Sequence, residues 1–429
     1  MLNYLIIGAG PAGLATAVAL KKKRIAFEIV DAGNKVGGIW DIKRANTPMY
    51  QSAHFISSKT LSGFQDYPMP KDYPDYPSHS LVQSYIEKYS AYHELEAHAR
   101  FNTKVIKAVP ANQNWKVTFD DSTEKIYKGV ICATGITWYK NLPKIEGTFE
   151  GEFIHSLDYT DASLFKNKKV LIIGGGNSGC DIACDAAAWA ERAFISLRRG
   201  YYFLPKYIFG LPADLFKEKF QFPNKYIDTK VSELLLNKVL VGNLEHYGLQ
   251  KPDHHLMESH PIMNNRLLHY LGHGDITAKK DVRAFDGRTV IFKDDTKEEI
   301  DLIVAATGYK RVFPFLAKEL LDFRESNGEI DLYLEIFSKR FDNLLFVGGI
   351  EVSSAVFGLF SLQGEMIATY LSAQENGNQL YQQFLERKSG KAINLKGRNK
   401  YVDSERHQRY VDKKLYRKVL NRQLKALIS

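Results

Sequence analysis

A short apolar run that leads directly into closely spaced glycines is the feature that most limits how this chain can fold. Residues 4–20 read YLIIGAGPAGLATAVAL, and Gly8, Gly10 and Gly13 stand where a strand pattern gives way to a helix pattern. Glycines at this spacing permit a tight turn and let the backbone approach a pyrophosphate group, which the N-terminus of the helix then stabilises. The segment therefore predicts a strand–turn–helix unit that binds a dinucleotide.

The residues that follow this loop strengthen the prediction. The strand pattern AFEIV ends at Asp31, where a carboxylate can accept hydrogen bonds from the hydroxyl groups of an adenosine ribose. The next motif, VGGIW, combines glycines that allow close backbone approach with a tryptophan that offers a flat apolar face. The residues that we expect to contact this first dinucleotide are Gly8, Ala9, Gly10, Pro11, Ala12, Gly13, Asp31, Gly38, Ile39 and Trp40.

A second glycine-rich turn lies in the middle of the chain. Residues 170–187 read VLIIGGGNSGCDIACDAA, and the next strand pattern ends in Arg198 and Arg199 instead of an acidic residue. Guanidinium groups pair with a 2′-phosphate, so we interpret this as a site for NADP(H) that tolerates NADH; the alternative is that both arginines are simply solvated. The residues predicted to contact this second nucleotide are Gly174, Gly176, Asn177, Ser178, Gly179, Cys180, Asp181, Arg198 and Arg199.

Related units recur along the chain. Strand patterns at 130–135 and 303–308 end in the similar phrases VICATG and IVAATG, and a third strand–glycine–helix unit occupies 344–371. Such repetition indicates an α/β fold with parallel sheets and more than one nucleotide-sized site. The length of 429 residues fits two domains. Three residues at the end of the first of these strands join the cofactor-binding candidates: Ala133, Thr134 and Gly135.

Composition argues against several other classes of protein. With 45% hydrophobic and 25% charged residues, the chain is an ordinary globular sequence and not a disordered one. The net charge of +9 comes almost entirely from Lys396 onward, where eleven basic residues face three acidic ones, so nucleic-acid binding is not expected. No apolar run approaches the ~18 residues of a membrane span, and no signal peptide precedes the first strand, which predicts a cytoplasmic protein.

Neither the cysteines nor the histidines form a recognisable site. Cys132, Cys180 and Cys184 lack both the even number of a disulfide framework and the CxxC spacing of a dithiol reductase, so we expect small buried residues. Five histidines between residues 254 and 273 are irregularly spaced and have no cysteine or acidic partner in a metal-site pattern. We therefore expect no metal.

The stretch FEGEFIHSLDY at 149–159 carries a resemblance to a known family. Its F-x-G-x-x-x-H-x-x-x-Y pattern resembles the fingerprint of class B flavoprotein monooxygenases. Tyr159 followed by Thr160 resembles the flavin-containing monooxygenase branch more than the Baeyer–Villiger branch, in which Trp-Pro ends the motif. The motifs VGGIW, DYPSH, GGGNSGCDIA, SLRRG and ATGYKRVFPFL agree. The chain is thus similar to bacterial-type flavin-containing monooxygenases from about residue 3 to residue 372.

This resemblance implies a fold, two cofactors and a reaction. It implies two dinucleotide-binding (Rossmann-like) domains, with FAD in the first, NADPH in the second, and the NADP domain inserted into the FAD domain. It further implies that reduced FAD captures O₂ as a flavin C4a-hydroperoxide. This species oxygenates the nitrogen or sulfur atom of small amines and sulfides, with Baeyer–Villiger oxidation as a side activity. A homodimer is also implied.

The expected segments follow from that plan. They are the first part of the FAD domain (1–145), a linker with the fingerprint (146–162), the NADP domain with an aromatic insert (163–300), the second part of the FAD domain (301–395) and a basic helical tail (396–429). Within the linker we expect Phe149 and Tyr159 to pack into the domain junction and Gly151 to permit a turn. His155 is expected to order the junction, with a direct catalytic base as the alternative. Gln363 is expected to contact the flavin from the start of the helix after the third glycine-rich segment.

One position departs from the family pattern. Family members commonly carry an asparagine that faces the flavin, and the corresponding residue here is Ile56, which cannot donate a hydrogen bond. Ser57, or Ser58 after a shift of the loop by one residue, is the expected substitute. The catalytic candidates are Ser57, Asn177 and Ser178. The last two lie where the resemblance implies that NADP⁺ is held, although Asn and Ser also commonly cap helices.

Ile56 leaves other functions open. Without the amide the enzyme becomes an uncoupled NADPH oxidase that releases H₂O₂, or a flavin-linked reductase. A third hypothesis is a non-catalytic FAD/NADP-binding sensor whose basic tail docks a partner. The tail has apolar residues at helical spacing from Val411 to Ile428, which either pack on the protein's own core or bind a partner or an anionic surface.

Overall fold

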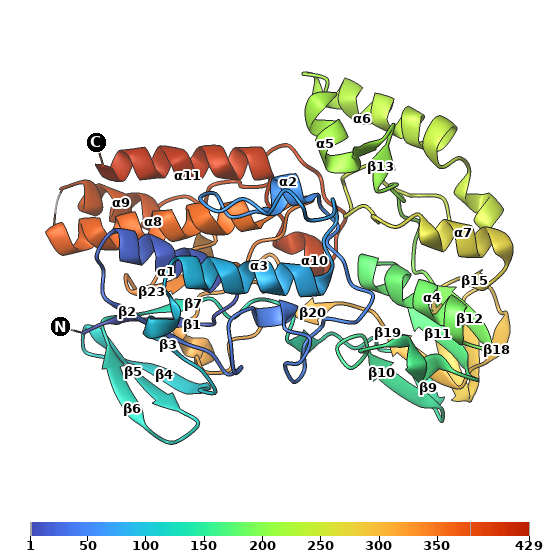
Figure 1. Cartoon of the computed structure of the whole chain (residues 1–429), viewed down its shortest axis with the longest axis horizontal. Helices are drawn as coiled ribbons and strands as arrows, with labels where there is room; N and C mark the ends of the chain where they lie inside the picture. Colours follow the sequence, from blue (N-terminus) through green and yellow to red (C-terminus); the bar gives the residue numbers. More distant parts are fainter. Residues whose placement is uncertain (1, 378, 429) are drawn as a thin grey trace.

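The computed structural model describes residues 2–377 and 379–428 and contains two lobes, each built around a mostly parallel sheet (Figure 1). Both ends of the chain build the first lobe, whereas the middle of the chain builds the second. The predicted α/β fold with two Rossmann-like domains, one inserted into the other, is therefore confirmed.

Seven strands form the sheet of the first lobe, in the order β21-β22-β23-β7-β1-β2-β3. The strands from β23 to β3 run parallel, and β22 and β21 extend the sheet antiparallel at one edge. All residues of β1 and β7 are buried, as expected for central strands covered on both faces. The strands are β1 (Tyr4–Ile7), β2 (Phe27–Val30), β3 (Ala99–Arg100), β7 (Gly129–Cys132), β21 (Leu332–Tyr333), β22 (Phe337–Ser338) and β23 (Leu344–Phe346).

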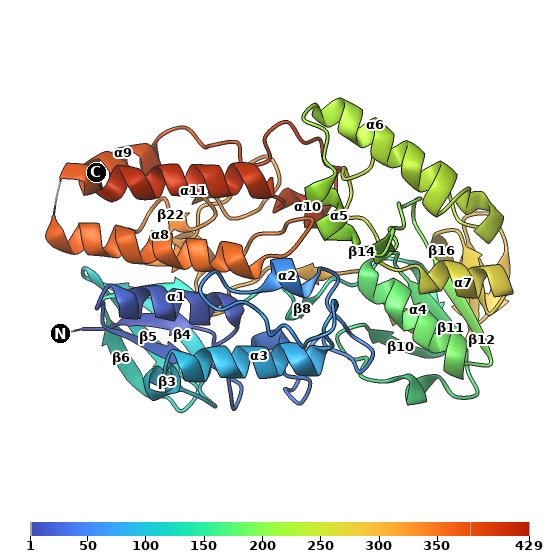
Figure 2. The ribbon, with the colours of Figure 1, turned by 45° about the horizontal axis from the view of Figure 1, so that its top comes forward.

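Helices α1, α8 and α11 cover one face of this sheet (Figure 2). Gly364 of α8 crosses α1 so closely that a Cβ on it would lie 2.8 Å from Thr16 Cα, which explains a glycine inside a long helix. The helices of this lobe are α1 (Pro11–Lys22), α2 (Lys59–Ser62), α3 (His79–Tyr92), α8 (Phe357–Asn376), α9 (Gln379–Ser389), α10 (Glu405–Gln408) and α11 (Lys413–Ile428). An antiparallel meander covers the other face with Trp115, Val117 and Phe119, and its strands are β4 (Val105–Ala111), β5 (Asn114–Phe119) and β6 (Glu124–Tyr127).

Five strands form the sheet of the inserted lobe, in the order β10-β19-β11-β12-β15, and all of them run parallel. They are β10 (Glu152–His155), β11 (Lys169–Ile173), β12 (Arg192–Ser196), β15 (Ile276–Lys279) and β19 (Leu302–Ala305). Helices α4 (Asn177–Trp189) and α7 (Arg266–His273) pack against it, while α5 (Ala213–Lys219) and α6 (Lys225–Leu235) form an excursion at the top of Figure 1, next to the hairpin of β13 (Tyr207–Ile208) and β14 (Leu211–Pro212).

The chain crosses between the lobes twice, and the two crossings pair with each other. β8 (Tyr139–Lys140), which leaves the first lobe, pairs antiparallel with β20 (Tyr309–Lys310), which returns to it. A four-stranded sheet next to the inserted lobe contains β9 (Glu146–Phe149), β16 (Val282–Gly287), β17 (Thr289–Phe292) and β18 (Lys297–Glu299).

The segment 146–162 is more than a linker, because it contributes β9 and the edge strand β10. Phe149 packs against Phe285 of the small sheet, with ring centroids 5.5 Å apart, so its expected place in the domain junction is wrong. Gly151 does not adopt a positive φ; instead, a Cβ there would lie 2.5 Å from the Phe149 ring and 2.7 Å from the Asp301 carbonyl oxygen. The expectation for Tyr159 is confirmed, because its buried ring lies 5.8 Å from that of Tyr50 in the first lobe.

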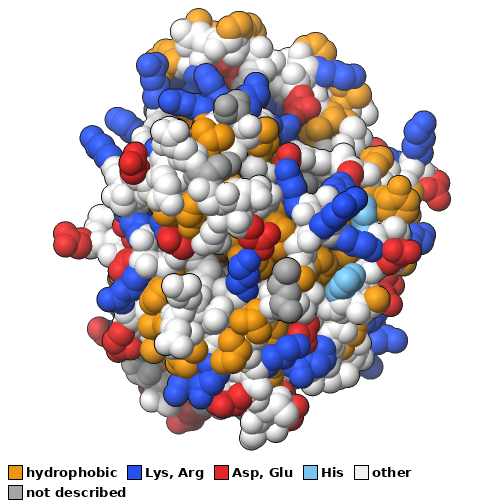
Figure 3. All heavy atoms as spheres, turned by 90° about the vertical axis from the view of Figure 1, so that its left-hand side faces the viewer, with side chains coloured by type: hydrophobic (Ala, Val, Ile, Leu, Met, Phe, Trp, Pro, Cys, Tyr) orange, Lys and Arg blue, Asp and Glu red, His pale blue; other side chains and the backbone are white. Residues whose placement is uncertain are grey.

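The basic tail packs on the protein's own core. Tyr416, Leu420, Leu424 and Leu427 of α11 are buried against α8 and α9, whereas Ile428 is exposed. Figure 3 views the end of the molecule where both termini lie, and it shows Lys and Arg side chains interspersed with acidic ones on that face. Across residues 2–377 and 379–428, no helix combines the length and apolar character needed to cross a membrane.

Candidate functional site

The first glycine-rich loop has two glycines that close the turn and one that leaves space. Gly8 has φ +116°, and a Cβ on it would lie 2.5 Å from the carbonyl oxygen of Ala133; a Cβ on Gly13 would lie 2.0 Å from the Gly8 oxygen. A Cβ on Gly10, in contrast, would have Gly38 Cα as its nearest neighbour, 3.6 Å away. The backbone at Gly10 therefore leaves space for close approach by a ligand, as binding of a pyrophosphate requires. Gly38 is more crowded, because its φ is +63° and a Cβ on it would lie 3.0 Å from Gly10 Cα.

Asp31 is buried beside this loop and holds it in shape. Its Oδ2 accepts a hydrogen bond from the Ala9 N–H at 2.7 Å, and its Oδ1 accepts one from the Gly33 N–H at 2.7 Å. Arg44 forms an ion pair with Oδ1 at 2.7 Å and lies over the Trp138 ring at 4.6 Å. A carboxylate can accept about four hydrogen bonds, so these contacts are compatible with a ribose hydroxyl at the same group. No sequence motif indicated a role for Arg44.

The other residues predicted at the first site surround the same turn. Pro11 and Ala12 are the first two residues of α1. Ala12 lies so close to Gly348 that a Cβ on Gly348 would be 2.6 Å from the Ala12 Cβ. Ile39 accepts a hydrogen bond from the Thr47 hydroxyl at 2.7 Å, and Trp40 packs edge-on against Phe55. Ala133, Thr134 and Gly135 follow β7, and the Thr134 hydroxyl is buried without a partner in the described part of the chain.

The second glycine-rich loop repeats this construction. Gly174 has φ +122°, and a Cβ on it would lie 2.4 Å from the Ala306 oxygen; a Cβ on Gly179 would lie 2.0 Å from the Gly174 oxygen. Gly176, which precedes α4, has no atom within 4 Å of the position of a Cβ. The space above Gly176 is therefore free for a nucleotide phosphate.

Asn177 has one end of its amide fixed and the other unpaired. Its Oδ1 accepts a hydrogen bond from the Met263 N–H at 2.8 Å, while its Nδ2 is buried and lacks a partner within residues 2–377 and 379–428. Asn177 is the first residue of α4 and Gly176 is its N-cap, with no side-chain cap, so the helix-capping alternative does not hold for Asn177. A buried amide that can still donate points to an acceptor on a bound ligand.

Two predicted residues of the second site are committed elsewhere. Cys180 is fully buried in the core of the lobe, and its N–H donates to the Gly176 oxygen within the helix. Asp181 accepts hydrogen bonds from Tyr50 at 3.0 Å and from Asn264 at 2.6 Å. The prediction that these side chains contact the nucleotide is not supported, because a glycine-rich motif does not reveal which of its positions face the core. All three cysteines are buried and free, as expected.

Asp181 and Asp185, four residues apart on one face of α4, join the two lobes. Asp185 accepts hydrogen bonds from the Ser52 hydroxyl at 2.5 Å and from the Tyr159 phenol at 2.9 Å. Tyr50 also hydrogen-bonds Ser178, and burial together with the Asp181 carboxylate raises the pKa of the Tyr50 phenol well above its ordinary value. The segment around Tyr50 and Ser52 therefore docks on the start of α4, a contact that the sequence motifs did not reveal.

The two arginines after β12 differ in their surroundings. Arg198 is exposed, whereas Arg199 donates to one oxygen of Asp253 from Nε at 3.0 Å and from Nη2 at 2.9 Å. Arg198 is thus the freer of the two for a 2′-phosphate.

The loop at 55–62 assigns its two serines different roles. The Ser57 hydroxyl lies 2.8 Å from the Ser62 hydroxyl, which itself donates to the Ser58 oxygen, so the proton of Ser57 is used within the loop. The Ser58 hydroxyl is buried with no partner among the residues described, and its N–H donates to Asp214 of α5 at 2.7 Å. Ile56 is half-buried. Ser58 is therefore a better candidate donor than Ser57.

His155 orders the junction and has no free nitrogen for base catalysis. Its Nδ1 accepts a hydrogen bond from the Leu157 N–H at 3.0 Å, so its Nε2 carries the proton and donates to the Gly308 oxygen at 3.0 Å. Burial lowers the pKa of the ring, which remains neutral. Gly308 follows the returning strand β19, so His155 fixes the point where the chain goes back to the first lobe.

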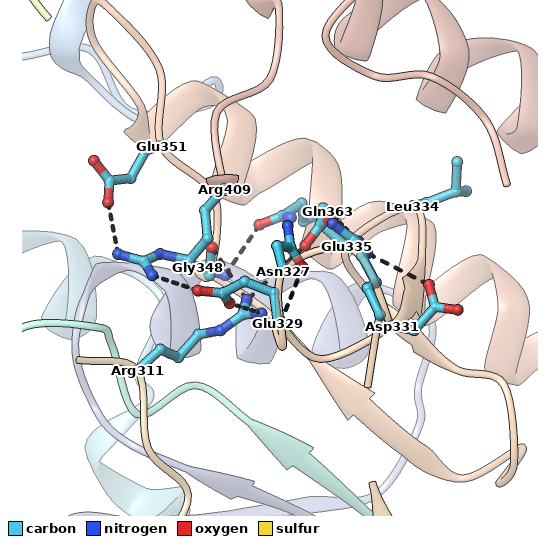
Figure 4. A network of polar contacts seen from close by, with 12 residues as sticks. Arg311, Asn327, Glu329, Asp331, Leu334, Glu335, Gly348, Glu351, Gln363 and Arg409 are labelled. Atoms are coloured by element: carbon cyan, nitrogen blue, oxygen red, sulfur yellow. Dashed lines mark hydrogen bonds and ion pairs between the residues drawn. The ribbon is translucent and has the colours of Figure 1, made fainter. Parts of the chain in front are cut away.

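Gln363 lies inside the first lobe and has both ends of its amide occupied, as Figure 4 shows in part. Its Oε1 accepts from the Gly348 N–H at 3.1 Å, and its Nε2 donates to the Tyr416 phenol at 2.8 Å. It is fully buried and stands well inside α8, which begins at Phe357. The predicted flavin contact is not supported, because the length of the loop before α8 could not be judged from the sequence.

Within the described ranges, no group of three metal-binding side chains occurs. Two glycine-rich nucleotide sites on two Rossmann-like sheets, one inserted into the other, define an oxidoreductase of the class with two dinucleotide-binding domains.

Comparisons with known proteins identify the family. The family model described as FMO-like (flavin-binding monooxygenase-like) matches residues 3–413. Mouse flavin-containing monooxygenase 1 is 30% identical over 386 residues, with 85% of this chain and 70% of the relative covered. Human flavin-containing monooxygenase 3 is 30% identical over 387 residues, covering 85% and 72%. This chain belongs to the flavin-binding monooxygenase family and is a monooxygenase that uses FAD and NADPH.

Solved structures share the fold. The flavin-containing monooxygenase from Stenotrophomonas maltophilia is 19% identical with a TM-score of 0.65, covering 88% of this chain and 98% of that one. Cyclohexanone monooxygenase with bound ε-caprolactone is 18% identical with a TM-score of 0.72, covering 98% and 97%. The agreement extends over both lobes.

Proposed function

We propose that this enzyme transfers one oxygen atom of O₂ to the nitrogen or sulfur atom of a small amine or sulfide, with Baeyer–Villiger oxidation of ketones as a side activity. NADPH supplies the two electrons that reduce the second oxygen atom to water. The observation that carries the proposal is the unpaired Asn177 amide beside the open space at Gly176, next to the contact between the lobes. That arrangement is suited to holding a nicotinamide nucleotide between the two sites.

The residues that would hold the two cofactors lie in the glycine-rich loops and next to them. For FAD these are the loop from Gly8 to Gly13, Asp31, and Gly38 to Trp40; for NADPH they are Gly174, Gly176, Asn177, Ser178, Gly179 and Arg198. Bound FAD, once reduced by NADPH, supplies the chemistry that activates O₂.

The protein's own contribution is to orient groups at the junction of the two lobes. Met263 fixes the Asn177 oxygen, so that the amide presents its NH₂ end to the bound nucleotide. Tyr50 and Ser52 close the first lobe onto α4. Ser58 supplies a hydroxyl donor near Ile56, where the resemblance predicts an amide. Tyr159 in place of Trp-Pro makes the Baeyer–Villiger reaction secondary.

The second candidate function is an NADPH oxidase that releases H₂O₂, and the observation that favours it is Ile56. The test uses purified enzyme with NADPH, ¹⁸O₂ and a panel of small sulfides and amines. The proposal expects about one ¹⁸O atom in the organic product for each NADPH consumed. Formation of H₂O₂ in an amount equal to the NADPH consumed, with no labelled product, would establish the oxidase instead.

The finer organisation is part of the same proposal. We assign residues 1–145 and 301–395 to the FAD domain, 146–162 to the connection, 163–300 to the NADP domain and 396–429 to the tail. Small molecules and O₂ are the expected partners, with a homodimer in the cytoplasm as the expected assembly and location. Light scattering after gel filtration tests the dimer, and cell fractionation tests the location.

A further inference from the structure

The C-terminal segment, here residues 399–412, bridges the two lobes. Arg409 forms ion pairs with Glu329 at 2.8 Å and Glu351 at 3.1 Å, both in the first lobe (Figure 4). The next residue, Tyr410, contacts His260 of the inserted lobe. Tyr410 is also bridged to Glu351 in extended conformation, in which neighbouring side chains point to opposite sides. Adjacent residues therefore anchor the segment to different lobes.

His260 is held from two directions by this segment. Its backbone N–H donates to Nε2 of His407 at 3.1 Å, and its ring Nδ1 contacts the Tyr410 phenol. Arg406 donates a hydrogen bond to the Tyr410 oxygen, which leaves the phenol proton for His260 Nδ1. Both imidazole rings are buried, with 6% of each residue exposed. The position of His260 is therefore set by the C-terminal segment.

A few residues after His260, the chain reaches the second glycine-rich loop. Met263 donates its N–H to the Asn177 oxygen at 2.8 Å, and Asn264 donates to Asp181 at 2.6 Å. These two contacts fix which way the Asn177 amide faces. The unpaired Asn177 NH₂ can only donate, so it requires an acceptor such as a carboxamide or phosphate oxygen.

We propose that Tyr410 and His260 are positioning residues of the nucleotide site, which hold residues 260–264 so that these orient the Asn177 amide toward bound NADP⁺. This inference rests on the proposed function and deepens it, because it makes the C-terminal segment part of the second cofactor site. Neither residue needs to touch the nucleotide itself.

The test compares the binding of NADP⁺ to the purified FAD-loaded wild type and to Tyr410→Phe by calorimetry, a readout that needs no turnover. Tyr410→Phe is expected to raise the dissociation constant about three- to tenfold, the effect of one buried hydrogen bond. Tyr401→Phe is the matched control, because its hydroxyl accepts from Asn399 inside the same segment, at 3.1 Å. The control is expected to bind NADP⁺ like the wild type.

A double-mutant cycle distinguishes positioning from a general loss of structure. In an Asn177→Ala background the amide is absent, so adding Tyr410→Phe is expected to leave the dissociation constant unchanged. An equal loss in both backgrounds overturns the proposal, and so does wild-type affinity in Tyr410→Phe. A wild type that fails to bind NADP⁺ contradicts the proposed function as well as this inference.

If Tyr410→Phe does not fold, His260 offers a second pair of variants. His260→Asn keeps an acceptor near the position of Nδ1, whereas His260→Leu removes it. Retained NADP⁺ affinity in His260→Asn together with a three- to tenfold loss in His260→Leu supports the proposal. Equal affinity in the two variants overturns it.

Discussion

The phenol of Tyr50 donates a hydrogen bond to the carboxylate of Asp181 at 3.0 Å and so ties the first lobe to the first turns of α4, the helix that follows the second glycine-rich loop. Ser52 and Asp185 make a second such contact at 2.5 Å. Both acceptors lie on one face of α4, close to Asn177 and Ser178. The distance between the two glycine-rich loops is therefore set by side chains and not by the crossing strands alone.

Removal of the Tyr50 hydroxyl tests this contact. Tyr50→Phe is expected to lower the free energy of unfolding by about 1–2 kcal/mol, because it leaves a partly buried carboxylate oxygen of Asp181 without its donor. It is also expected to slow the reduction of FAD by NADPH, measured anaerobically by stopped-flow absorbance. Tyr92→Phe, at an exposed position, is the control. Unchanged reduction in Tyr50→Phe would show that the contact does not set the geometry of the sites.

The glycines of the second loop separate folding from binding. Gly176→Ala places its methyl group in open space at a φ of −76°, so the variant is expected to keep the wild-type midpoint of thermal unfolding and to lose most NADP⁺ binding. Gly174→Ala is expected to fail to fold well, because its φ is +122° and its methyl group would meet the Ala306 oxygen at 2.4 Å. Calorimetry of both variants checks this, and normal NADP⁺ binding by Gly176→Ala would contradict the site.

Arg198 is predicted to select NADPH over NADH. A charge-assisted pair with the 2′-phosphate contributes about 1.5–3 kcal/mol, so Arg198→Ala is expected to raise the KM for NADPH about ten- to a hundredfold and to leave that for NADH nearly unchanged. Arg192→Ala, at the opposite end of β12, is the matched control. Steady-state kinetics with both nucleotides make the measurement, and an equal rise for NADH would exclude a role in recognising the phosphate.

Ser58 and Ser57 are predicted to differ although they are neighbours. Ser58→Ala removes a buried hydroxyl that is free to donate, so the fraction of NADPH that ends as H₂O₂ is expected to rise several-fold. Ser57→Ala removes a hydroxyl that is bound to Ser62 and is expected to leave that fraction unchanged. A peroxide assay beside NADPH consumption gives the ratio. The reverse order would restore Ser57 as the substitute for the missing amide.

Acid is predicted to weaken the attachment of the C-terminal segment. Burial, with Arg406 close by, lowers the pKa of His407 from 6.5 to about 4. As the pH falls, the unfolded chain binds a proton at this histidine before the folded protein does. The contribution of neutral His407 to the free energy of unfolding is therefore complete above pH 6.5 and decreases as the pH falls toward 4; the loss is about 2 kcal/mol at pH 5. His407→Gln keeps an acceptor for the His260 N–H and is expected to show a smaller fall of the thermal midpoint between pH 7 and pH 5. Equal pH dependence in both proteins would contradict this assignment.

The two nucleotide loops could be predicted from the sequence because their requirements are local. Gly8 and Gly174 adopt positive φ angles, and Gly13 and Gly179 touch the carbonyl groups of their own loops, so glycine is needed whatever the rest of the chain does. The similar strand ends VICATG and IVAATG likewise indicated parallel α/β units, whereas the insertion of one lobe into the other was implied only by the family resemblance.

Only the tertiary structure decided the contacts between residues that are distant in the chain. Asn177 is oriented by Met263, Asp181 meets Tyr50, and His260 meets Tyr410, and no sequence spacing encodes these pairs. Gln363 donates a hydrogen bond to the Tyr416 phenol inside the first lobe, because α11 packs against α8 and brings Tyr416 next to it. Sequence patterns reveal what the backbone of a short segment requires, whereas the partner of a polar side chain depends on which segments the packing of two lobes and a tail brings together.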